Sequence, residues 1–399
     1  MTAAARHVRG GPGSRSGDRD RDRDARERFF AAGGAGGGAD LSVSLGGLRL
    51  SNPVMPASGC FGPELAPLLP MGELGAVVTK TVFARRRGGN AAHRLTETPL
   101  GMINSVGIPS PGTRGFVEDV LPRYRATGRP VVVSVGGLRI DEYLRVADEL
   151  AGVGCAAFEV NVSCPNLEHG GIEIGASPEA VHRVTDGVRR RLGDVPVWVK
   201  LTPMAPDIAA VADAAQSAGA RALTVANSFP GMVVSSGDGT PVLGNGVGGV
   251  SGPAIKPLVL RLVWLVARSV SIPVIGCGGI GSAQDVLDHL RVGATAVQVG
   301  TATFARPQVM AEIVRELDAL CARAGVATLQ GLVHAGRHAD AVSGPAGTPD
   351  EARARRDDMP TRQASPHERM AEHAGSHSRP TSDQDVVDEP AGDDLAAAP

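Results

Sequence analysis

The amino-acid sequence predicts a (β/α)8 barrel, an α/β fold in which eight parallel strands are each followed by a helix. Two observations predict it. Short, apolar, β-rich segments alternate with helical patterns, and polar or glycine residues gather where those segments end. The segments with the strand pattern are Val54–Ala57, Ala76–Lys80, Val131–Val135, Phe158–Asn161, Val197–Lys200, Leu223–Ala226, Val274–Cys277 and Ala296–Val299.

The segments between these strands carry apolar residues at helical spacing. They include Asp141–Val153, Pro178–Leu192, Asp207–Ala218, Lys256–Val270 and Ala283–Arg291. Before the first strand, Leu41–Val43 and Leu48–Leu50 flank Gly46-Gly47, so we expect an N-terminal β-hairpin that covers the lower end of the barrel. The alternative fold is an open doubly wound sheet. That fold needs a G-x-G-x-x-G loop after its first strand, and residues 57–62 lack this spacing.

We expect one folded domain, residues 40–335, between two disordered segments, residues 1–39 and 336–399. The first segment alternates aspartate and arginine from Asp18 to Asp24, and the second is rich in Arg, Asp, Ala, Pro and His. Neither can bury enough apolar surface to offset the entropy lost on ordering. The C-terminal histidines lack neighbours that would fix a ligand geometry, so we expect no metal site there.

Composition excludes several classes of function. The formal net charge of −2 and the aromatic content of 3% give no sign of a nucleic-acid partner. No apolar run approaches the roughly 20 residues that span a bilayer, so we expect no membrane segment. The five cysteines are scattered and form no C-x-x-C pair. This pattern favours reduced thiols in a cytoplasm, without a zinc or iron–sulfur centre on this chain.

Two of the predicted strands end in lysine, at Lys80 and Lys200. A lysine that terminates an apolar strand points into the mouth of the barrel, where its charge needs an anionic partner. The carboxyl ends of the strands are also where barrels build their active sites. We therefore expect both lysines to take part in binding or catalysis.

Glycines follow the last two predicted strands, as Gly278-Gly279 and as Gly300 before Thr301. Because glycine has no Cβ atom, backbone N–H groups at these positions can approach a phosphate closely, and the following helix adds positive potential. Barrels often bind phosphate at this place. Ordinary tight turns are the alternative for either pair alone, and the presence of both favours a phosphate site.

Cys164 lies in a loop after the fourth strand, together with Pro165 and Gly170-Gly171. A glycine-containing loop above a barrel mouth is typical of an active-site lid, and an inert buried cysteine is the alternative. A free thiol titrates near ~8.5 and can act as a base at mildly alkaline pH. Residues 161–166, Asn-Val-Ser-Cys-Pro-Asn, resemble the catalytic loop of the cysteine-type (class 1) dihydroorotate dehydrogenases, which make orotate in pyrimidine biosynthesis.

The resemblance covers about residues 41–335 and includes segments 57–62, 78–81, 101–107, 251–257 and 299–301 in the family's order. It implies FMN as the cofactor and Cys164 as the base that removes a proton from C5 of dihydroorotate, while the hydride on C6 goes to the flavin. The positions that match substrate contacts are Lys80, Asn104, Ser105, Val106, Gly107, Ile108, Asn161, Asn227 and Ser228. The positions that match FMN contacts are Ser58, Lys80, Thr81, Ser134, Asn161, Lys200, Ala226, Gly252, Gly278, Gly279, Gly300 and Thr301.

The resemblance also bears on the electron acceptor. Quinone-linked relatives carry a serine base and an apolar N-terminal extension, which this sequence lacks. Residues 60–62 and 169–171 look most like the NAD-linked class 1B catalytic subunit. That class implies a partner subunit with FAD and a [2Fe–2S] cluster, in a heterotetramer built on a homodimer of the barrel. The alternatives are a fumarate-linked homodimer, whose features include residues 103–105, and another FMN barrel reductase such as a dihydropyrimidine dehydrogenase.

Overall fold

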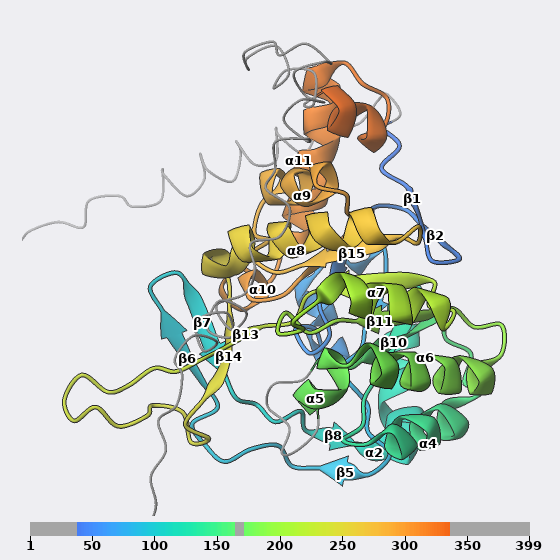
Figure 1. The fold of residues 1–399 in the computed structure, drawn as a ribbon. Coiled ribbons are helices and arrows are strands. Elements are labelled where there is room, and N and C mark those ends of the chain that lie inside the picture. The colour runs from blue at the N-terminus through green and yellow to red at the C-terminus, as the bar shows by residue number, and fades with distance from the viewer. Residues whose placement is uncertain (1–37, 164–170, 336–399) are drawn as a thin grey trace, which may run out of the picture. The chain divides into compact units, whose positions relative to one another are not determined.

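The computed structural model describes residues 38–163 and 171–335, and every structural statement below concerns these two ranges. Eight parallel strands form one sheet in the order β3-β16-β15-β12-β11-β10-β9-β4. The strands at the two ends of this order, β3 and β4, contact each other, so the sheet curves into a nearly closed barrel (Figure 1). The strands are β3 (Val54–Pro56), β4 (Val77–Val78), β9 (Val131–Val135), β10 (Ala157–Asn161), β11 (Val197–Lys200), β12 (Ala222–Val225), β15 (Val274–Cys277) and β16 (Ala296–Val299).

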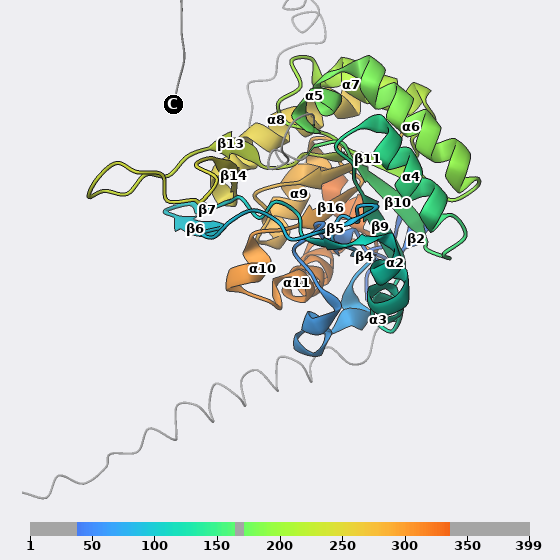
Figure 2. The ribbon, with the colours of Figure 1, turned by 90° about the horizontal axis from the view of Figure 1, so that it is seen from below.

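The predicted barrel is confirmed, with all eight strands in the predicted places. The largest difference is at β4, which is confined to Val77–Val78, so that Lys80 lies in the loop beyond the strand. The predicted helices are also present: α4 (Ile140–Leu150), α6 (Pro178–Leu192), α7 (Ile208–Ser217), α8 (Lys256–Ser269) and α9 (Ala283–Arg291). Figures 1 and 2 show α4, α6, α7 and α8 following one another around the outside of the sheet.

The helix α6 illustrates how local sequence sets these elements. Its N-cap residue Ser177 accepts a hydrogen bond from the backbone N–H of Ala180, and Pro178 occupies the first helical position, where no N–H is needed. Val181, Val184 and Val188 recur at helical spacing and are fully buried. The helix ends at Gly193, whose φ of 63° is readily adopted by glycine.

The N-terminal hairpin is present, but the predicted bounds of its first strand are wrong. Strand β1 is Val43–Leu45, not Leu41–Val43, and it pairs with β2 (Leu48–Leu50). The shift arises because Gly46 and Gly47 both have positive φ and form a two-residue turn, which places Leu45 opposite Leu48. A Cβ atom on Gly46 would lie 2.5 Å from Trp198 Nε1, so the hairpin covers the amino end of β11, as predicted.

A second, antiparallel sheet was not predicted. Its strands are β13 (Phe229–Gly231), β14 (Gly248–Ser251), β7 (Gly101–Asn104) and β6 (Leu95–Thr98), in that order. A short pair of strands, β5 (Arg86–Arg87) and β8 (Ser110–Pro111), accompanies it. Both arise from long excursions that follow β4 and β12, so they extend from the carboxyl end of the barrel strands. The four-stranded sheet lies to one side of the barrel in Figures 1 and 2.

The remaining helices are short apart from the last one. They are three 3-10 helices, Pro63–Leu68, Met71–Glu73 and Pro253–Ile255, together with α2 (Gly112–Gly115), the π-helix Phe116–Val120, α3 (Leu121–Arg125), α5 (Gly171–Ala176), α10 (Ala302–Ala305) and α11 (Val309–Ala324). No helix in the described part of the chain is both long enough and apolar enough to cross a membrane. The predicted disorder of residues 1–39 and 336–399 falls almost entirely outside the described residues and stays a prediction.

Candidate active site

Three polar side chains at or near the carboxyl ends of neighbouring strands are linked at the mouth of the barrel. Thr81 Oγ1 lies 2.9 Å from Ser134 Oγ, and Asn161 Nδ2 donates to Thr81 Oγ1 at 3.2 Å. The other side of the Asn161 amide is also used, because Oδ1 accepts from the backbone N–H of Ser163 at 3.1 Å. All of these side chains are buried. The amide of Asn161 is therefore held in one orientation, directly before the loop that contains Cys164.

Cys164 itself lies outside the described residues, whereas Ser163, the residue before it in the chain, is described. The side chain of Asn227, after β12, donates a hydrogen bond to the backbone carbonyl of Ser163. Asn227 Oδ1 in turn accepts from the N–H of Ser228 at 2.8 Å. The hydroxyl of Ser163 is buried and has no partner among the described residues. The structure thus brings together Asn161, Ser163 and Asn227 around the start of the Cys164 loop.

Lys200 lies at the end of β11 and is only 3% exposed. Its Nζ donates to Gln298 Oε1 at 3.5 Å. Burial alone lowers the pKa of Lys200, but Cys277, where its thiol is ionised, and Glu159 outweigh burial and raise this pKa above its usual value. The side chain is therefore an ammonium ion at neutral pH, placed where a developing negative charge can be stabilised.

Lys80 is half-buried and lines a cavity of about 570 Å³. Burial lowers its pKa, and the nearby positive charge of Arg94 lowers it further. Arg86, Arg87 and Asp119 also line this cavity, together with Pro109, Ser110, Pro111 and Gly115. Three cationic side chains against one carboxylate favour an anionic occupant.

Residues 104–108, predicted as a substrate cradle, comprise the last residue of β7 and the braced loop that follows it. Asn104 Nδ2 donates to the carbonyl of Gly249 on the neighbouring strand at 3.3 Å. Ile108 has a φ of 43°, which is strained for a β-branched residue and is the kind of backbone found at functional sites.

Asn90 is a bracing residue that the sequence analysis missed. Its side chain donates to Ser105 Oγ at 2.9 Å, and its backbone N–H donates to the carbonyl of Val106 at 3.1 Å. Arg94 holds Asn90 in turn, because Arg94 Nε donates to the Asn90 carbonyl at 2.5 Å. Asn90 therefore fixes the position of the predicted cradle from outside it.

The glycine loop after β15 has the backbone conformation that a close approach requires. Gly278 and Gly279 have φ of 139° and 72°. A Cβ atom on Gly279 would lie 2.7 Å from Lys256 Cα and 2.9 Å from Lys256 N, so glycine is needed here for the packing of α8. Within the described ranges, the backbone N–H groups of Gly279, Gly300 and Thr301 have no hydrogen-bond acceptor. Such free donors fit the predicted phosphate site.

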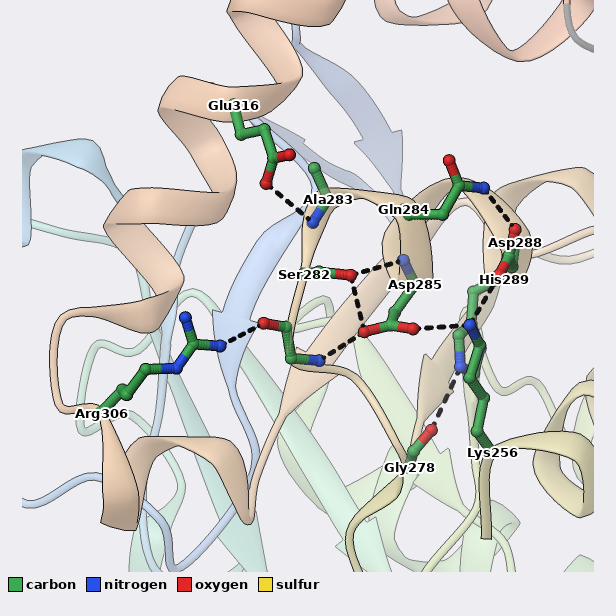
Figure 3. Close-up of polar contacts among 11 residues, drawn as sticks. Lys256, Gly278, Ser282, Ala283, Gln284, Asp285, Asp288, His289, Arg306 and Glu316 are labelled. Carbon is green, nitrogen blue, oxygen red and sulfur yellow. Dashed lines mark hydrogen bonds and ion pairs between the residues drawn. The ribbon is translucent and has the colours of Figure 1, made fainter. Parts of the chain in front are cut away.

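Charged residues on α8 and α9 hold the glycine loop after β15 in place (Figure 3). Lys256 Nζ contacts Asp285 Oδ1 at 2.5 Å and Asp288 Oδ2 at 2.6 Å. Asp285 Oδ2 accepts from the N–H of Gly281 at 2.9 Å and from Ser282 Oγ at 2.8 Å. The Asp285 carboxylate therefore bonds both to Lys256 at the start of α8 and to the residues that precede α9. These bonds set the shape of the glycine loop between β15 and α9.

His289 supports the same loop from inside the protein (Figure 3). It is fully buried, and its Nε2 lies 3.2 Å from the carbonyl of Gly278. Burial lowers the pKa of His289 to about 4. The ring is therefore neutral at pH 7, and the proton lies on Nε2, because a carbonyl can only accept.

The other predicted cofactor contacts occupy neighbouring strand ends and loops. Thr301 Oγ1 donates to Ser251 Oγ at 2.7 Å, beside Gly252 with its φ of 102°. Ala226 follows a cis peptide bond and its N–H donates to the carbonyl of Cys277 at 3.0 Å. Ser58 is half-buried directly after β3. The roles of these residues as FMN contacts stay predictions, although the residues all lie around the mouth of the barrel.

Cys277 has a charged neighbour in the fold that the sequence around it does not reveal. Cys277 is buried beside Lys200, a residue too distant in sequence for the contact to be foreseen. Burial raises the pKa of Cys277, and it raises the pKa of Cys60 to about 11, so both remain thiols at neutral pH. In the two described ranges no group of three or more His, Cys, Asp or Glu residues is arranged to hold a metal ion.

Comparisons with known proteins agree on one family. The model of the family described as dihydroorotate dehydrogenase matches residues 40–321. A relative from Solidesulfovibrio magneticus, named dihydroorotate dehydrogenase B (NAD(+)), catalytic subunit, is 45% identical over 293 residues, which is 73% of this chain and 96% of the relative. Relatives with the same name from Desulforudis audaxviator and Bacillus pumilus are 44% and 42% identical. The match to the Desulforudis audaxviator relative covers 74% of this chain and 96% of the relative. The match to the Bacillus pumilus relative covers 73% of this chain and 94% of the relative.

Proposed function

The chain belongs to the dihydroorotate dehydrogenase family, and from this premise we propose that it is the FMN-binding catalytic subunit of an NAD+-linked enzyme. It oxidises dihydroorotate to orotate in pyrimidine biosynthesis. The observation that carries the assignment is the identity of 41–45% with relatives whose shared name is dihydroorotate dehydrogenase B (NAD(+)), catalytic subunit. The buried ammonium of Lys200 and the cationic cavity at Lys80 support it, because a carboxylate substrate and a reducible flavin both need positive charge.

The residues at the barrel mouth suit FMN. Its phosphate would be held by the free N–H groups of Gly279, Gly300 and Thr301, at the starts of α9 and α10. Lys200 would face the flavin ring, where its positive charge favours the reduced, anionic form. When bound, FMN supplies the ring that accepts the hydride from C6 of dihydroorotate.

The chain's own residues would bind the substrate and remove its proton. Lys80 offsets the charge of the substrate carboxylate, and Asn104, Asn161 and Asn227 bind its polar ring atoms. Asn161 and Asn227 are pre-oriented for this task by their hydrogen bonds around Ser163. Cys164, as thiolate, takes the proton from C5, so that the electron pair of the C6–H bond can leave as hydride.

Electrons would then pass to a second subunit. The relatives' names contain both "catalytic subunit" and NAD(+), and this chain carries no group of metal-ligating residues in its described part. We place FAD and a [2Fe–2S] cluster on the partner, in a heterotetramer around a homodimer of the barrel. A cytoplasmic location is supported by the free thiols of the four described cysteines.

The test is an acceptor panel with the purified chain. With dihydroorotate as donor, we expect turnover with an artificial dye and negligible reduction of NAD+. Adding the FAD and [2Fe–2S] subunit should restore reduction of NAD+ in a stable complex. Rapid turnover with fumarate by the chain alone would contradict the NAD+ linkage and favour the fumarate-linked type. A lack of turnover with every acceptor in the panel would contradict the proposed function.

A further inference from the structure

A carboxylate lies in the closed interior of the barrel, below the proposed active site. Glu159 on β10 is 0% exposed. Its Oε2 accepts from Thr224 Oγ1 on β12 at 2.9 Å and from Gln298 Nε2 on β16 at 2.5 Å. Neither strand is a neighbour of β10 in the sheet, so these bonds cross the barrel interior. Burying a carboxylate is costly unless its charge is compensated, and the fold alone does not require one here.

Gln298 connects this carboxylate to Lys200. Its Oε1 accepts from Lys200 Nζ, while its Nε2 donates to Glu159. The opposite orientation of the amide would place N–H groups against an ammonium ion and an oxygen against a carboxylate. The amide dipole is therefore aligned between the two charges, and Gln298 transmits the attraction between them.

Within residues 38–163 and 171–335, Glu159 is the one carboxylate among the groups that raise the pKa of Lys200. The groups that act on Lys200 are Cys277 on β15, Glu159 on β10 and Cys60 after β3. Both cysteines have raised pKa values, chiefly through burial, and are neutral thiols at pH 7. An ammonium that is 3% exposed would otherwise lose its proton readily, because buried lysines without a counter-charge are deprotonated far below their usual pKa.

We propose that Glu159, acting through Gln298, is the positioning residue that keeps Lys200 charged and directed at the barrel mouth. This inference rests on the proposed FMN site. Because Glu159 is 0% exposed, it acts through Gln298 and not through direct contact with a ligand at the mouth. Its function is to fix the positive charge that the reduced flavin experiences, so it sets the reduction potential and its dependence on pH.

The test is the midpoint potential of the bound flavin as a function of pH in the wild-type protein and in Glu159→Gln. In the wild-type protein Lys200 stays charged across the accessible range. In the variant, Lys200 lacks its counter-charge and loses its proton at lower pH. The potential of the variant should match or exceed that of the wild type at acid pH and fall below it at alkaline pH. A difference that does not change with pH would overturn the proposal.

Matched variants separate charge from packing. Thr224→Val removes the other hydrogen bond to Glu159 but leaves the charge, so its pH profile should follow the wild type. If Glu159→Gln retains no flavin, Glu159→Asp is the deciding variant. Flavin retained by aspartate supports the need for charge, and flavin lost from both variants indicates packing and contradicts it. Wild-type protein without flavin would defeat the proposed function itself.

Discussion

Replacing Gly279 by alanine tests whether the glycine loop is shaped by its packing against α8. The new Cβ would lie 2.7 Å from Lys256 Cα and 2.9 Å from Lys256 N, at a φ of 72°. A left-handed conformation costs a non-glycine residue about 1–2 kcal/mol, and overpacking adds about 1–3 kcal/mol. We therefore expect Gly279→Ala to lower the free energy of unfolding by about 2–5 kcal/mol.

The same change should weaken the binding of FMN, because the loop can escape the clash only by moving the N–H groups proposed to hold the phosphate. We expect the dissociation constant for FMN to rise at least ~10-fold, equivalent to about 1.4 kcal/mol. Denaturant unfolding of the flavin-free protein and titration of flavin fluorescence measure the two effects separately.

Gly281→Ala is the matched control in the same loop. A Cβ atom there would meet Ala302 Cβ at 3.6 Å, an ordinary contact, and the N–H of Gly281 is already bonded to Asp285. We expect a change in stability within about 0.5 kcal/mol and normal FMN binding. The reasoning is refuted if Gly279→Ala behaves like this control.

Three further predictions concern residues around the mouth. Cys164→Ala should retain FMN but lose ~10²–10⁴-fold in the rate at which dihydroorotate reduces the flavin, and near-normal reduction would rule out its role as base. Asn90→Ala should raise the KM for dihydroorotate ~10-fold with FMN content unchanged, since about 1.4 kcal/mol from one lost, partly buried hydrogen bond is a factor of ten. An unchanged KM in steady-state assays would contradict its bracing role. His289 has a folded pKa of about 4 against 6.5 when unfolded, so its contribution to stability is complete above pH 6.5 and is lost as the pH falls towards 4. That loss is about 3 kcal/mol, and His289→Gln should remove it from the pH profile of unfolding, whereas identical profiles would count against the assignment.

The barrel could be predicted because parallel strands buried on both faces appear as continuous apolar runs. Strand β9, for example, is Val-Val-Val-Ser-Val and is buried throughout. The antiparallel sheet could not be predicted in the same way. Strand β14 is Gly-Gly-Val-Ser, and the glycines leave no alternating pattern for a sequence analysis to detect.

The site residues also divide into those that the sequence could predict and those that it could not. Lys80 and Lys200 were found because a charge at the end of an apolar strand is conspicuous. Glu159, Gln298 and Asn90 were missed, because each acts through a partner that only the fold brings near. Glu159 and Gln298 are 139 positions apart in the sequence, and nothing in either strand alone indicates the other.

The most direct test of the account is anaerobic mixing of the purified, flavin-loaded chain with dihydroorotate, without any other acceptor. We expect the visible absorbance of the oxidised flavin to be lost in a single turnover and one orotate to form for each flavin reduced. A flavin that stays oxidised in the wild-type chain while it binds orotate would contradict the account.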